Sequence, residues 1–460
     1  MSVAALILAA GEGTRMRSDL PKVAHCVLGI PMVSHVLAAA RLAGCDPVVT
    51  VTGHRADAVE ALLPGESFAR QDRQLGTGHA VMCAEDALKG HVGSLLVLSG
   101  DTPLMRPETL RALVEARQAS GAAACVLTTH MDDPTGYGRI VRTDTGEVAG
   151  IVEQKDASAA QAAITEVNTG TYCFDAQVLF THLHRLQADN AQGEFYLTDM
   201  IAVFRAEGLE VAAVTTADPD EAMGVNNRVQ LARAGDVLRD RVNEGHMLAG
   251  VTMTDPSLVW IAPTVSLGRD VVIEPMTFLF GSTTIGDGVL LGPGTRIYDG
   301  EVGAGAVVEQ SLVRGGRIGT DATVGPNAFI RPGTVLEAGA KVGSFVEVKN
   351  TTIGEGSKVP HLSYMGDATI GRGVNVGAGS ITCNYDGVSK HSTIIGDGAF
   401  IGSDTMLVAP VEIGANAITG AGSAIAKDVP AGSLGIERTD QRTVEGWADR
   451  RRKARDDGSE

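Results

Sequence analysis

Paired cysteines are missing from this chain of 460 residues. Its six cysteines are Cys26, Cys45, Cys83, Cys125, Cys173 and Cys383. They are scattered along the sequence, and no two of them form a CxxC motif. This distribution argues against a disulfide framework and against a zinc site, and it is typical of a reducing compartment. We therefore expect a cytoplasmic protein.

A secretion signal and a long hydrophobic run are also missing. The N-terminus lacks the charged region and the cleavage site of a signal peptide. The apolar stretch VAALILAA, residues 3–10, is far shorter than the roughly 20 residues that a membrane-spanning helix needs. We expect no membrane span.

Positive charge is scarce. The chain has 38 Lys and Arg against 55 Asp and Glu, which gives a formal net charge of −17. Since binding to nucleic-acid phosphates needs net or local basic surface, this balance argues against a nucleic-acid partner. The one dense basic run, residues 450–455, has acidic residues on both sides, and we interpret it as part of a solvated C-terminal tail.

The first half of the chain alternates strand and helix patterns. Predicted strands are residues 3–9, 48–52, 95–99, 123–128, 171–174 and 211–215. A helix is predicted over residues 31–42, with Pro31 in its first turn and Gly44 after its end. Apolar strands separated by helices predict an α/β fold with a mostly parallel, doubly wound sheet.

A second helix pattern covers residues 229–249, in which Leu231, Ala234, Leu238 and Val242 fall roughly on one face. We expect this helix to connect two domains.

After residue 250 aliphatic residues recur every six positions. The repeated positions are Leu279, Ile285, Leu291 and Ile297; then Ile318, Val324, Ile330, Leu336, Val342 and Val348; then Ile395, Ile401, Leu407, Ile413, Thr419 and Ile425. This spacing predicts a parallel β-helix, whose stacked coils point one aliphatic side chain per face into a shared core. An irregular glycine-rich region does not explain it. The break at residues 383–392 predicts a loop that leaves one coil.

The stretch LAAGEGTRM, residues 8–16, follows the first predicted strand, where open α/β sheets bind ligands. Met16 occupies the third glycine position of a dinucleotide fingerprint, and the GK[ST] of a P-loop is absent. Glycines let backbone N–H groups approach phosphates, and Arg15 and Lys22 add two cations. A triphosphate site is one interpretation, and a turn with surface charges is the other.

Further motifs decide between these interpretations. They are QLGTGHA at residues 74–80, SGD at 99–101, GYGRI at 136–140, GIVEQKD at 150–156, NTGTY at 168–172 and GVNNR at 224–228. With LAAGEGTRM they resemble the sugar-phosphate nucleotidyltransferases. Together with the hexads, the match narrows to the bacterial enzymes that combine UDP-N-acetylglucosamine pyrophosphorylase and glucosamine-1-phosphate N-acetyltransferase. It covers nearly the whole chain except about the last dozen residues.

The resemblance implies a bifunctional enzyme. Its first reaction transfers acetyl from acetyl-CoA to glucosamine 1-phosphate. Its second transfers uridylyl from UTP to N-acetylglucosamine 1-phosphate, which releases pyrophosphate and supplies UDP-N-acetylglucosamine for peptidoglycan and lipopolysaccharide precursors. It also implies Mg²⁺ and a homotrimer with acetyl sites between subunits.

The implied domains are a Rossmann-like uridylyltransferase at residues 1–228, a linker helix at 229–249 and a left-handed β-helix acetyltransferase at 250–460. Two alternatives stay open. In the first, the chain is a pyrophosphorylase whose β-helix only assembles an oligomer; in the second, it is a non-catalytic sugar-nucleotide sensor.

The resemblance also implies the residues of the uridylyl site. Asp101 and Asn226 are the implied Mg²⁺ ligands, with Asn227 as a neighbour that does not bind metal, whereas an aspartate after a strand is otherwise often a helix N-cap. Gln71 is implied to read the uracil edge. The nucleotide and sugar set is Leu8, Ala9, Ala10, Gly11, Arg15, Lys22, Gln71, Gly76, Thr77, Ser99, Gly100, Asp101, Gly138, Glu153, Asn168 and Asn226. Ser99 stands where relatives often carry an aromatic residue, so the strictness of UTP preference stays open.

The acetyl site is implied by RPG, EVKN, PHLSYMGD and CNYDG within the hexad region. His361 is the expected general base, since a glucosamine ammonium must lose a proton before it attacks a thioester. We expect Glu347 to orient His361. The implied glucosamine-phosphate and acetyl-CoA set is Arg331, Lys349, Tyr364, Asn375, Ala378, Asn384, Tyr385, Ser403, Ala421 and Arg438.

Overall fold

The structure is a computed structural model, and it describes residues 2–457. The chain divides between Val242 and Asn243 into two compact units. None of the helices in the described part of the chain is both long and apolar enough to cross a membrane.

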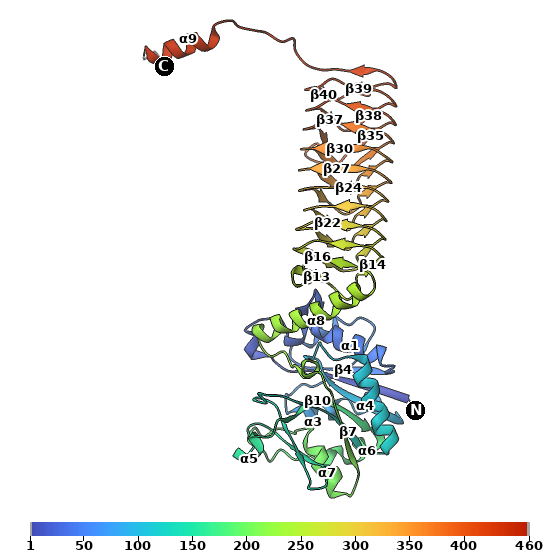
Figure 1. The fold of residues 1–460 in the computed structure, drawn as a ribbon, viewed down its shortest axis with the longest axis vertical. Helices are drawn as coiled ribbons and strands as arrows, with labels where there is room; N and C mark the ends of the chain where they lie inside the picture. Colours follow the sequence, from blue (N-terminus) through green and yellow to red (C-terminus); the bar gives the residue numbers. More distant parts are fainter. Residues whose placement is uncertain (1, 458–460) are drawn as a thin grey trace. The chain divides into compact units, whose positions relative to one another are not determined.

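The first unit is built on a mixed, mostly parallel sheet (Figure 1). Its strand order is β11-β7-β10-β6-β1-β4-β5. The strands are β1 (Ser2–Ala9), β4 (Val48–Thr52), β5 (Ser67–Arg70), β6 (Gly93–Ser99), β7 (Ala124–His130), β10 (Glu166–Asp175) and β11 (Val211–Thr215). Only β10 on this path runs antiparallel to its neighbours. The predicted doubly wound sheet is confirmed.

Helices cover both faces of this sheet. Alternate residues of β1 enter two different cores, Leu6 with α3, α6 and α7 and Ile7 with α1 and α4. The helices are α1 (Met32–Leu42), α2 (Ala56–Glu60), α3 (Thr77–Cys83), α4 (Pro107–Ser120), α5 (Ala159–Ala162), α6 (Ala176–His182) and α7 (Asp199–Ala206). Burial on both faces explains why these strands are continuous apolar runs in the sequence.

Some strands of this unit were not predicted. They are β5, the short pair β2 (Cys26–Val27) and β3 (Ile30–Pro31), and the hairpin β8 (Arg139–Arg142) and β9 (Val148–Val152). The first half of β10 was missed as well, since the register shifts between Asn168 and Tyr172 and interrupts the strand pattern.

Helix α8 (Arg228–Leu248) crosses the division between the units, at the place where the sequence predicts a helix. Its first half packs Leu231, Ala234 and Leu238 on an apolar cluster of the first unit. In the second unit, the buried Asn243 amide donates to the carbonyls of Pro256 and Val259 at 2.8 and 2.9 Å.

The second unit is a parallel β-helix of three sheets (Figure 1). Face one holds β12 (Thr252–Met253), β15 (Val272–Ile273), β18 (Leu290–Leu291), β21 (Val307–Val308), β24 (Thr323–Val324), β27 (Lys341–Ser344), β30 (Lys358–His361), β33 (Asn375–Val376), β36 (Phe400–Ile401), β39 (Ile418–Thr419) and β41 (Leu434–Gly435). Face two holds β13 (Val259–Ile261), β16 (Thr277–Phe280), β19 (Arg296–Tyr298), β22 (Leu312–Arg314), β25 (Phe329–Ile330), β28 (Glu347–Lys349), β31 (Tyr364–Gly366), β34 (Ile381–Cys383), β37 (Met406–Val408) and β40 (Ala424–Ile425). Face three holds β14 (Ser266–Leu267), β17 (Thr284–Ile285), β20 (Glu301–Val302), β23 (Arg317–Ile318), β26 (Val335–Leu336), β29 (Thr352–Ile353), β32 (Ala368–Ile370), β35 (Thr393–Ile395) and β38 (Val411–Ile413).

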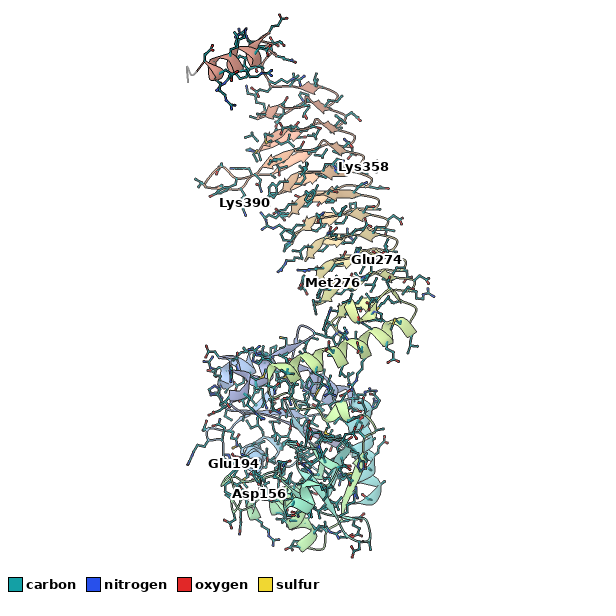
Figure 2. The ribbon with its side chains drawn as sticks, turned by 60° about the vertical axis from the view of Figure 1, so that its left-hand side comes forward. Asp156, Glu194, Glu274, Met276, Lys358 and Lys390 are labelled. Atoms are coloured by element: carbon teal, nitrogen blue, oxygen red, sulfur yellow. The ribbon has the colours of Figure 1, made fainter. Side chains whose placement is uncertain are left out.

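The six-residue pattern marks the interior of this β-helix. Every repeated position named from the sequence is at most 5% exposed. The predicted break is confirmed as a loop between β34 and β35, closed by a bridge between Tyr385 and Lys390. Figure 2 shows Lys390 on this loop, away from the stacked strands. The basic tail forms helix α9 (Trp447–Asp456), which buries none of its residues.

Truncating one core side chain tests this interior. Ile330→Ala should lower the free energy of unfolding by about 2–5 kcal/mol, because it leaves a cavity among stacked aliphatics. The measurement is a urea titration followed by circular dichroism. Val388→Ala, at a side chain 89% exposed in the loop, should change it by less than about 0.5 kcal/mol. Equal effects from the two variants would contradict the assignment.

Candidate active sites

A cavity of about 300 Å³ lies at the carboxyl ends of β1, β5 and β6. It is lined by ten of the predicted residues, Leu8, Ala9, Ala10, Gly11, Lys22, Gln71, Gly76, Thr77, Ser99 and Asp101. Its other lining residues, which the sequence did not single out, are Val23, Gln74, Ala80 and Glu194. Gly100 is not in the lining; its N–H donates to the Leu8 carbonyl at 2.9 Å and shapes the adjacent turn.

Two cationic side chains and two side-chain oxygens that could bind a metal meet beside this cavity. Lys22 Nζ lies 2.5 Å from Asp101 Oδ2 and 3.2 Å from Asn226 Oδ1. Arg15 Nη2 donates to the same Asn226 oxygen at 2.8 Å. The Lys22 and Asp101 side chains are only 17% and 16% exposed, so water screens this pair poorly.

Hydrogen bonds of the main chain hold the segments that carry Asp101 and Asn226 in place. The Val225 N–H donates to the Asp101 carbonyl at 2.9 Å, which ties the segment before α8 to the end of β6. The Asn226 N–H donates to Gln230 Oε1 at 2.8 Å. Asn227 has a different task, because its Oδ1 accepts from the Gln230 N–H at the start of α8.

The helix N-cap interpretation of Asp101 is wrong. Helix α4 begins at Pro107 and its N-cap is Arg106, whereas the Asp101 carboxylate contacts Lys22. Asp101 and Asn226 share one hydrogen-bond donor, and such a pair of converging oxygens fits Mg²⁺, which takes one or two protein oxygens plus phosphates and water. Within residues 2–457 there is no group of three or more His, Cys, Asp or Glu that could hold a metal.

A second cavity, of about 570 Å³, shares Thr77 and Glu194 with the first. It is lined by Arg15, Thr77, Gly136, Glu153, Gln154, Lys155, Gln192, Glu194 and Tyr196. Burial raises the pKa of Glu153, whose carboxylate accepts from Thr198 at 3.3 Å. A Cβ on Gly138 would lie 3.5 Å from Glu153 and 3.6 Å from Asn168, so the three predicted sugar residues lie together.

The Asn168 amide is held from both ends. Its Nδ2 donates to the Tyr172 hydroxyl at 2.7 Å, and its Oδ1 accepts from the Gly170 N–H at 3.1 Å. The side chain is therefore fixed by its own strand, β10.

In the second unit four of the predicted phosphate and sugar residues, Arg331, Lys349, Tyr364 and Asn384, lie on or just after strands of face two, whereas Asn375 lies on face one. Strand register aligns Ile330 with Val348 and Lys349 with Gly366, so Arg331 and Lys349 lie at equivalent positions of neighbouring coils. A Cβ on Gly366 would lie 2.4 Å from the Tyr364 hydroxyl and 2.8 Å from Asn384 Nδ2. Glycine at this position therefore lets both polar groups lie over the strand.

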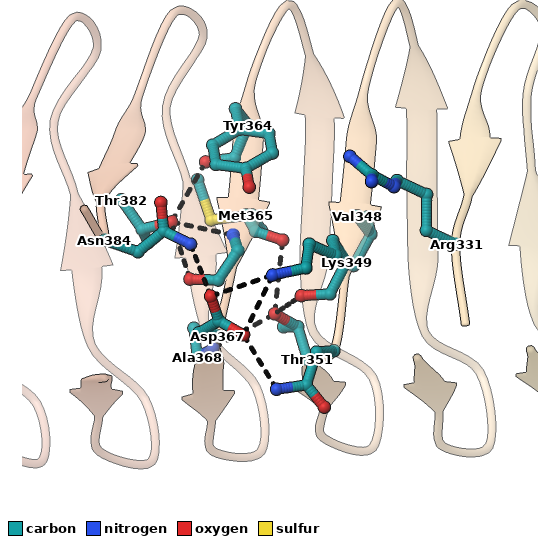
Figure 3. A network of polar contacts seen from close by, with 12 residues as sticks. Arg331, Val348, Lys349, Thr351, Tyr364, Met365, Asp367, Ala368, Thr382 and Asn384 are labelled. Atoms are coloured by element: carbon teal, nitrogen blue, oxygen red, sulfur yellow. Dashed lines mark hydrogen bonds and ion pairs between the residues drawn. The ribbon is translucent and has the colours of Figure 1, made fainter. Parts of the chain in front are cut away.

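Asp367 organises this cluster (Figure 3). Its carboxylate accepts from Lys349 Nζ at 3.1 Å, from Asn350 Nδ2 at 2.7 Å and from Asn384 Nδ2 at 2.5 Å. Burial alone would raise the pKa of Asp367, but these hydrogen bonds outweigh it and lower the pKa. Asp367 thus stays ionised and holds Lys349 and Asn384 in place.

Lys390 is a functional candidate that the sequence analysis missed. It belongs to the loop that interrupts the hexads, and its nearness to Lys349 lowers the pKa of Lys390. The Asp367 carboxylate partly offsets this repulsion between the two ammonium groups. The sequence feature that could have identified Lys390 is a lysine within residues 383–392, the loop that interrupts the hexads.

His361 ends β30 on face one, and its side chain is exposed. Its carbonyl accepts from the Ser363 hydroxyl at 2.7 Å, which fixes the turn that follows. The Glu347 carboxylate accepts from Arg331 Nη1 at 2.7 Å, and a role of Glu347 in orienting His361 stays a prediction. The two residues lie on different faces of the β-helix, which sequence spacing does not reveal.

The predicted acetyl-CoA residues follow successive strands of face one. Ala378, Ser403 and Ala421 come just after β33, β36 and β39, and Arg438 Nη1 donates to the Ala421 carbonyl at 2.9 Å. A Cβ on Gly377 would lie 2.4 Å from the Ser403 nitrogen, so glycine permits close stacking along this corner.

Two other predicted residues lie outside this corner. Asn375 begins β33, in register with Phe400 of the next coil. Tyr385 is 60% exposed in the loop, and its hydroxyl donates to the Gly387 carbonyl at 2.6 Å.

Both units match known protein families. Residues 5–194 match the MobA-like NTP transferase domain, and residues 392–427 match the bacterial transferase hexapeptide (six repeats). A relative from Heliobacterium modesticaldum, named Bifunctional protein GlmU, is 52% identical over 450 residues, which are 98% of each chain. Relatives of the same name from Pelobacter propionicus and Streptomyces coelicolor are each 50% identical over 98% of this chain and cover 99% and 94% of their own. This chain belongs to the family of bifunctional GlmU proteins.

Proposed function

We propose that this chain makes UDP-N-acetylglucosamine in two steps, with one active site in each unit. Residues 250–460 transfer acetyl from acetyl-CoA to glucosamine 1-phosphate. Residues 1–228, joined to them by the helix at 229–249, then transfer uridylyl from UTP to N-acetylglucosamine 1-phosphate. The observation that carries the proposal is the meeting of Lys22, Arg15, Asp101 and Asn226 beside a nucleotide-sized cavity.

Uridylyl transfer brings two anions together. An oxygen of the sugar phosphate attacks the α-phosphorus of UTP, and pyrophosphate leaves. Because both partners are negative, charge neutralisation and alignment contribute more than proton transfer. Lys22 and Arg15 supply the neutralising cations, and backbone N–H groups of the glycine-containing turn after β1 face the phosphates.

Mg²⁺ is the proposed metal, and its ligands are Asp101 and Asn226. When bound, the ion neutralises phosphate charge and fixes the geometry of the triphosphate. Lys22 contacts both of these side chains, so the proposed Mg²⁺ ligands also hold a cation that the phosphates need.

The base occupies the first cavity and the sugar the second, which share Thr77 and Glu194 in their linings. Gln71, which is 3% exposed and lines the first cavity, reads the uracil edge. Glu153, Gly138 and Asn168 contact the sugar in the second. The raised pKa of Glu153 suits a carboxyl group that hydrogen-bonds sugar hydroxyls out of water.

Acetyl transfer needs a base near the amine. His361 removes a proton from the glucosamine ammonium, and the amine then attacks the acetyl-CoA thioester. Arg331 and Lys349 bind the sugar phosphate, with Lys390 as a third cation, while Tyr364, Asn375 and Asn384 position the ring. The thioester carries its own leaving group, so no covalent enzyme intermediate is required.

We also propose a homotrimer, in which neighbouring β-helices complete each acetyl site. The exposure of His361 and of the corner at Ser403 and Ala421 in a single chain supports this arrangement. Unpaired cysteines fit a cytoplasmic setting, where the product feeds cell-wall precursor synthesis.

Neighbouring asparagines separate metal binding from helix capping. Asn226→Ala should raise the Mg²⁺ concentration at half-maximal uridylyl transfer by about tenfold or more, since one of two protein ligands is lost. Asn227→Ala should lower stability by about 0.5–2 kcal/mol, because it removes a cap of α8. It should leave the Mg²⁺ dependence unchanged. Mg²⁺ titrations of pyrophosphate release and thermal melts measure the two effects. A similar Mg²⁺ shift in both variants would contradict the ligand assignment.

Replacing His361 tests the division of labour. His361→Ala should lower acetyl transfer to glucosamine 1-phosphate by about 10²–10⁴-fold, the usual contribution of a general base. Uridylyl transfer from UTP should stay near normal. His391→Ala is the matched control, since His391 pairs with Asp386 at 2.7 Å in the nearby loop. Both assays are run on the wild-type chain first. Loss of both activities in the His361 variant would contradict two independent sites.

The proposed role of Lys390 as a third cation is tested by varying the salt concentration. Lys390→Gln should raise the KM for glucosamine 1-phosphate about tenfold with little change in kcat, because a charged contact to the phosphate is lost. The difference should shrink in 1 M salt, which screens exposed charges. Lys358→Gln, on face one, is the control. An unchanged KM for the Lys390 variant would remove this residue from the site.

A further inference from the structure

The Gln71 side-chain amide lies between two acceptors. Its Nε2 is 3.0 Å from the Gly76 carbonyl oxygen and 3.0 Å from His79 Nδ1. The residue is 3% exposed, so water does not compete freely for these bonds. Gly76 and His79 belong to the turn and the first residues of α3, so one short segment supplies both contacts.

These contacts fix which end of the amide faces outward. A carbonyl oxygen can only accept, so the group opposite Gly76 must be the Gln71 NH₂. Its second hydrogen then points to His79 Nδ1, which must carry a lone pair. The neutral His79 ring is therefore protonated on Nε2. No contact of the Gln71 Oε1 atom is recorded among the residues that the structure describes, and this oxygen is the end left for a ligand.

His79 has few other polar neighbours that explain its position. Cys83 Sγ lies 3.9 Å from each ring nitrogen, and burial raises the pKa of that thiol, which keeps it a weak, neutral donor. His79 is absent from the lining of the nucleotide cavity, whereas Gln71 is part of it. His79 therefore does not contact a bound base directly, and its hydrogen bond to Gln71 is the route by which it can act on the base.

We propose that His79 is a positioning residue that sets the nucleobase selectivity of the uridylyl site. The inference rests on the proposed function, in which Gln71 meets the base. With its NH₂ held by His79 and Gly76, Gln71 offers only an acceptor. Uracil has a donor at N3 and pairs with it. Cytosine has an acceptor at N3, so two lone pairs face each other.

The two hydrogen bonds keep the Gln71 carboxamide in one orientation. A free carboxamide rotates by half a turn and presents its NH₂ to cytosine. In this site that rotation places Oε1 against the Gly76 carbonyl and the His79 lone pair, which are both acceptors. Uracil and cytosine have nearly the same size, so the shape of the pocket distinguishes them poorly. A buried polar group that stays unpaired with the wrong base gives a larger difference in binding free energy. His79 supplies one of the two bonds that prevent the rotation.

The test compares UTP with CTP as substrates of the whole chain. The measured quantity is the ratio of kcat/KM for UTP to kcat/KM for CTP, from pyrophosphate release with N-acetylglucosamine 1-phosphate. His79→Leu should lower this ratio about 2- to 10-fold, the value of one neutral hydrogen bond. His79→Asn should restore most of it, because Asn Oδ1 can accept near the position of Nδ1. If the leucine variant melts below the wild type, His79→Ala takes its place.

A double-mutant cycle distinguishes positioning from packing. Gln71→Met removes the amide and should itself lower the UTP to CTP ratio. Adding His79→Leu to it should cause no further change in the ratio, since no amide remains to be held. Additive effects would overturn the proposal, and so would equal ratios in the leucine, asparagine and wild-type chains.

The same experiment keeps the two hypotheses apart. A wild-type chain that releases no pyrophosphate from UTP contradicts the proposed function. A wild-type chain that is active and prefers UTP, with His79 variants that keep this preference, contradicts only the role of His79.

Discussion

Parallel strand pairing is the constraint on which both candidate sites depend. Parallel neighbours end at the same edge of a sheet, so whatever follows each strand is brought to one place. In the first unit this rule brings together the turn after β1, Gln71 after β5 and Asp101 after β6. In the second unit it stacks the residues that follow β33, β36 and β39 into a line along one corner. Neither site is local in sequence, and both are local in space for the same reason.

Opposite charges hold the functional groups in place before any substrate arrives. Lys22 rests on Asp101 and Asn226, and Lys349 rests on Asp367. In each case a cation that the phosphate needs is restrained by oxygens at the same site. Because these pairs are partly buried, screening by salt is weak and the cations are oriented in advance. The conformational entropy of these lysine side chains is therefore lost during folding rather than during binding.

Strongly periodic features were predictable from the sequence. Strands 48–52 and 211–215 coincide with β4 and β11, and the sixfold aliphatic pattern marks buried positions throughout the β-helix. The hairpin β8–β9 was missed, since it is short and carries Arg139 and Arg142 within its strands. The pair of Arg331 and Glu347 was not predicted, because nearness along the chain does not tell which side chains meet across neighbouring coils.

The sequence alone determined the architecture and the family, because both reside in spacing and in motifs whose order survives without coordinates. It also named Lys22, Asp101 and His361, whose residue types suit their proposed chemistry. Only the tertiary structure decided which groups touch. Lys22 contacts Asn226, whereas Asn227 caps helix α8. Asp367 is the centre of a polar cluster, and His79 contacts the Gln71 amide. Hydrogen bonds depend on distance and direction, and the fold fixes these across stretches of chain that no motif spans.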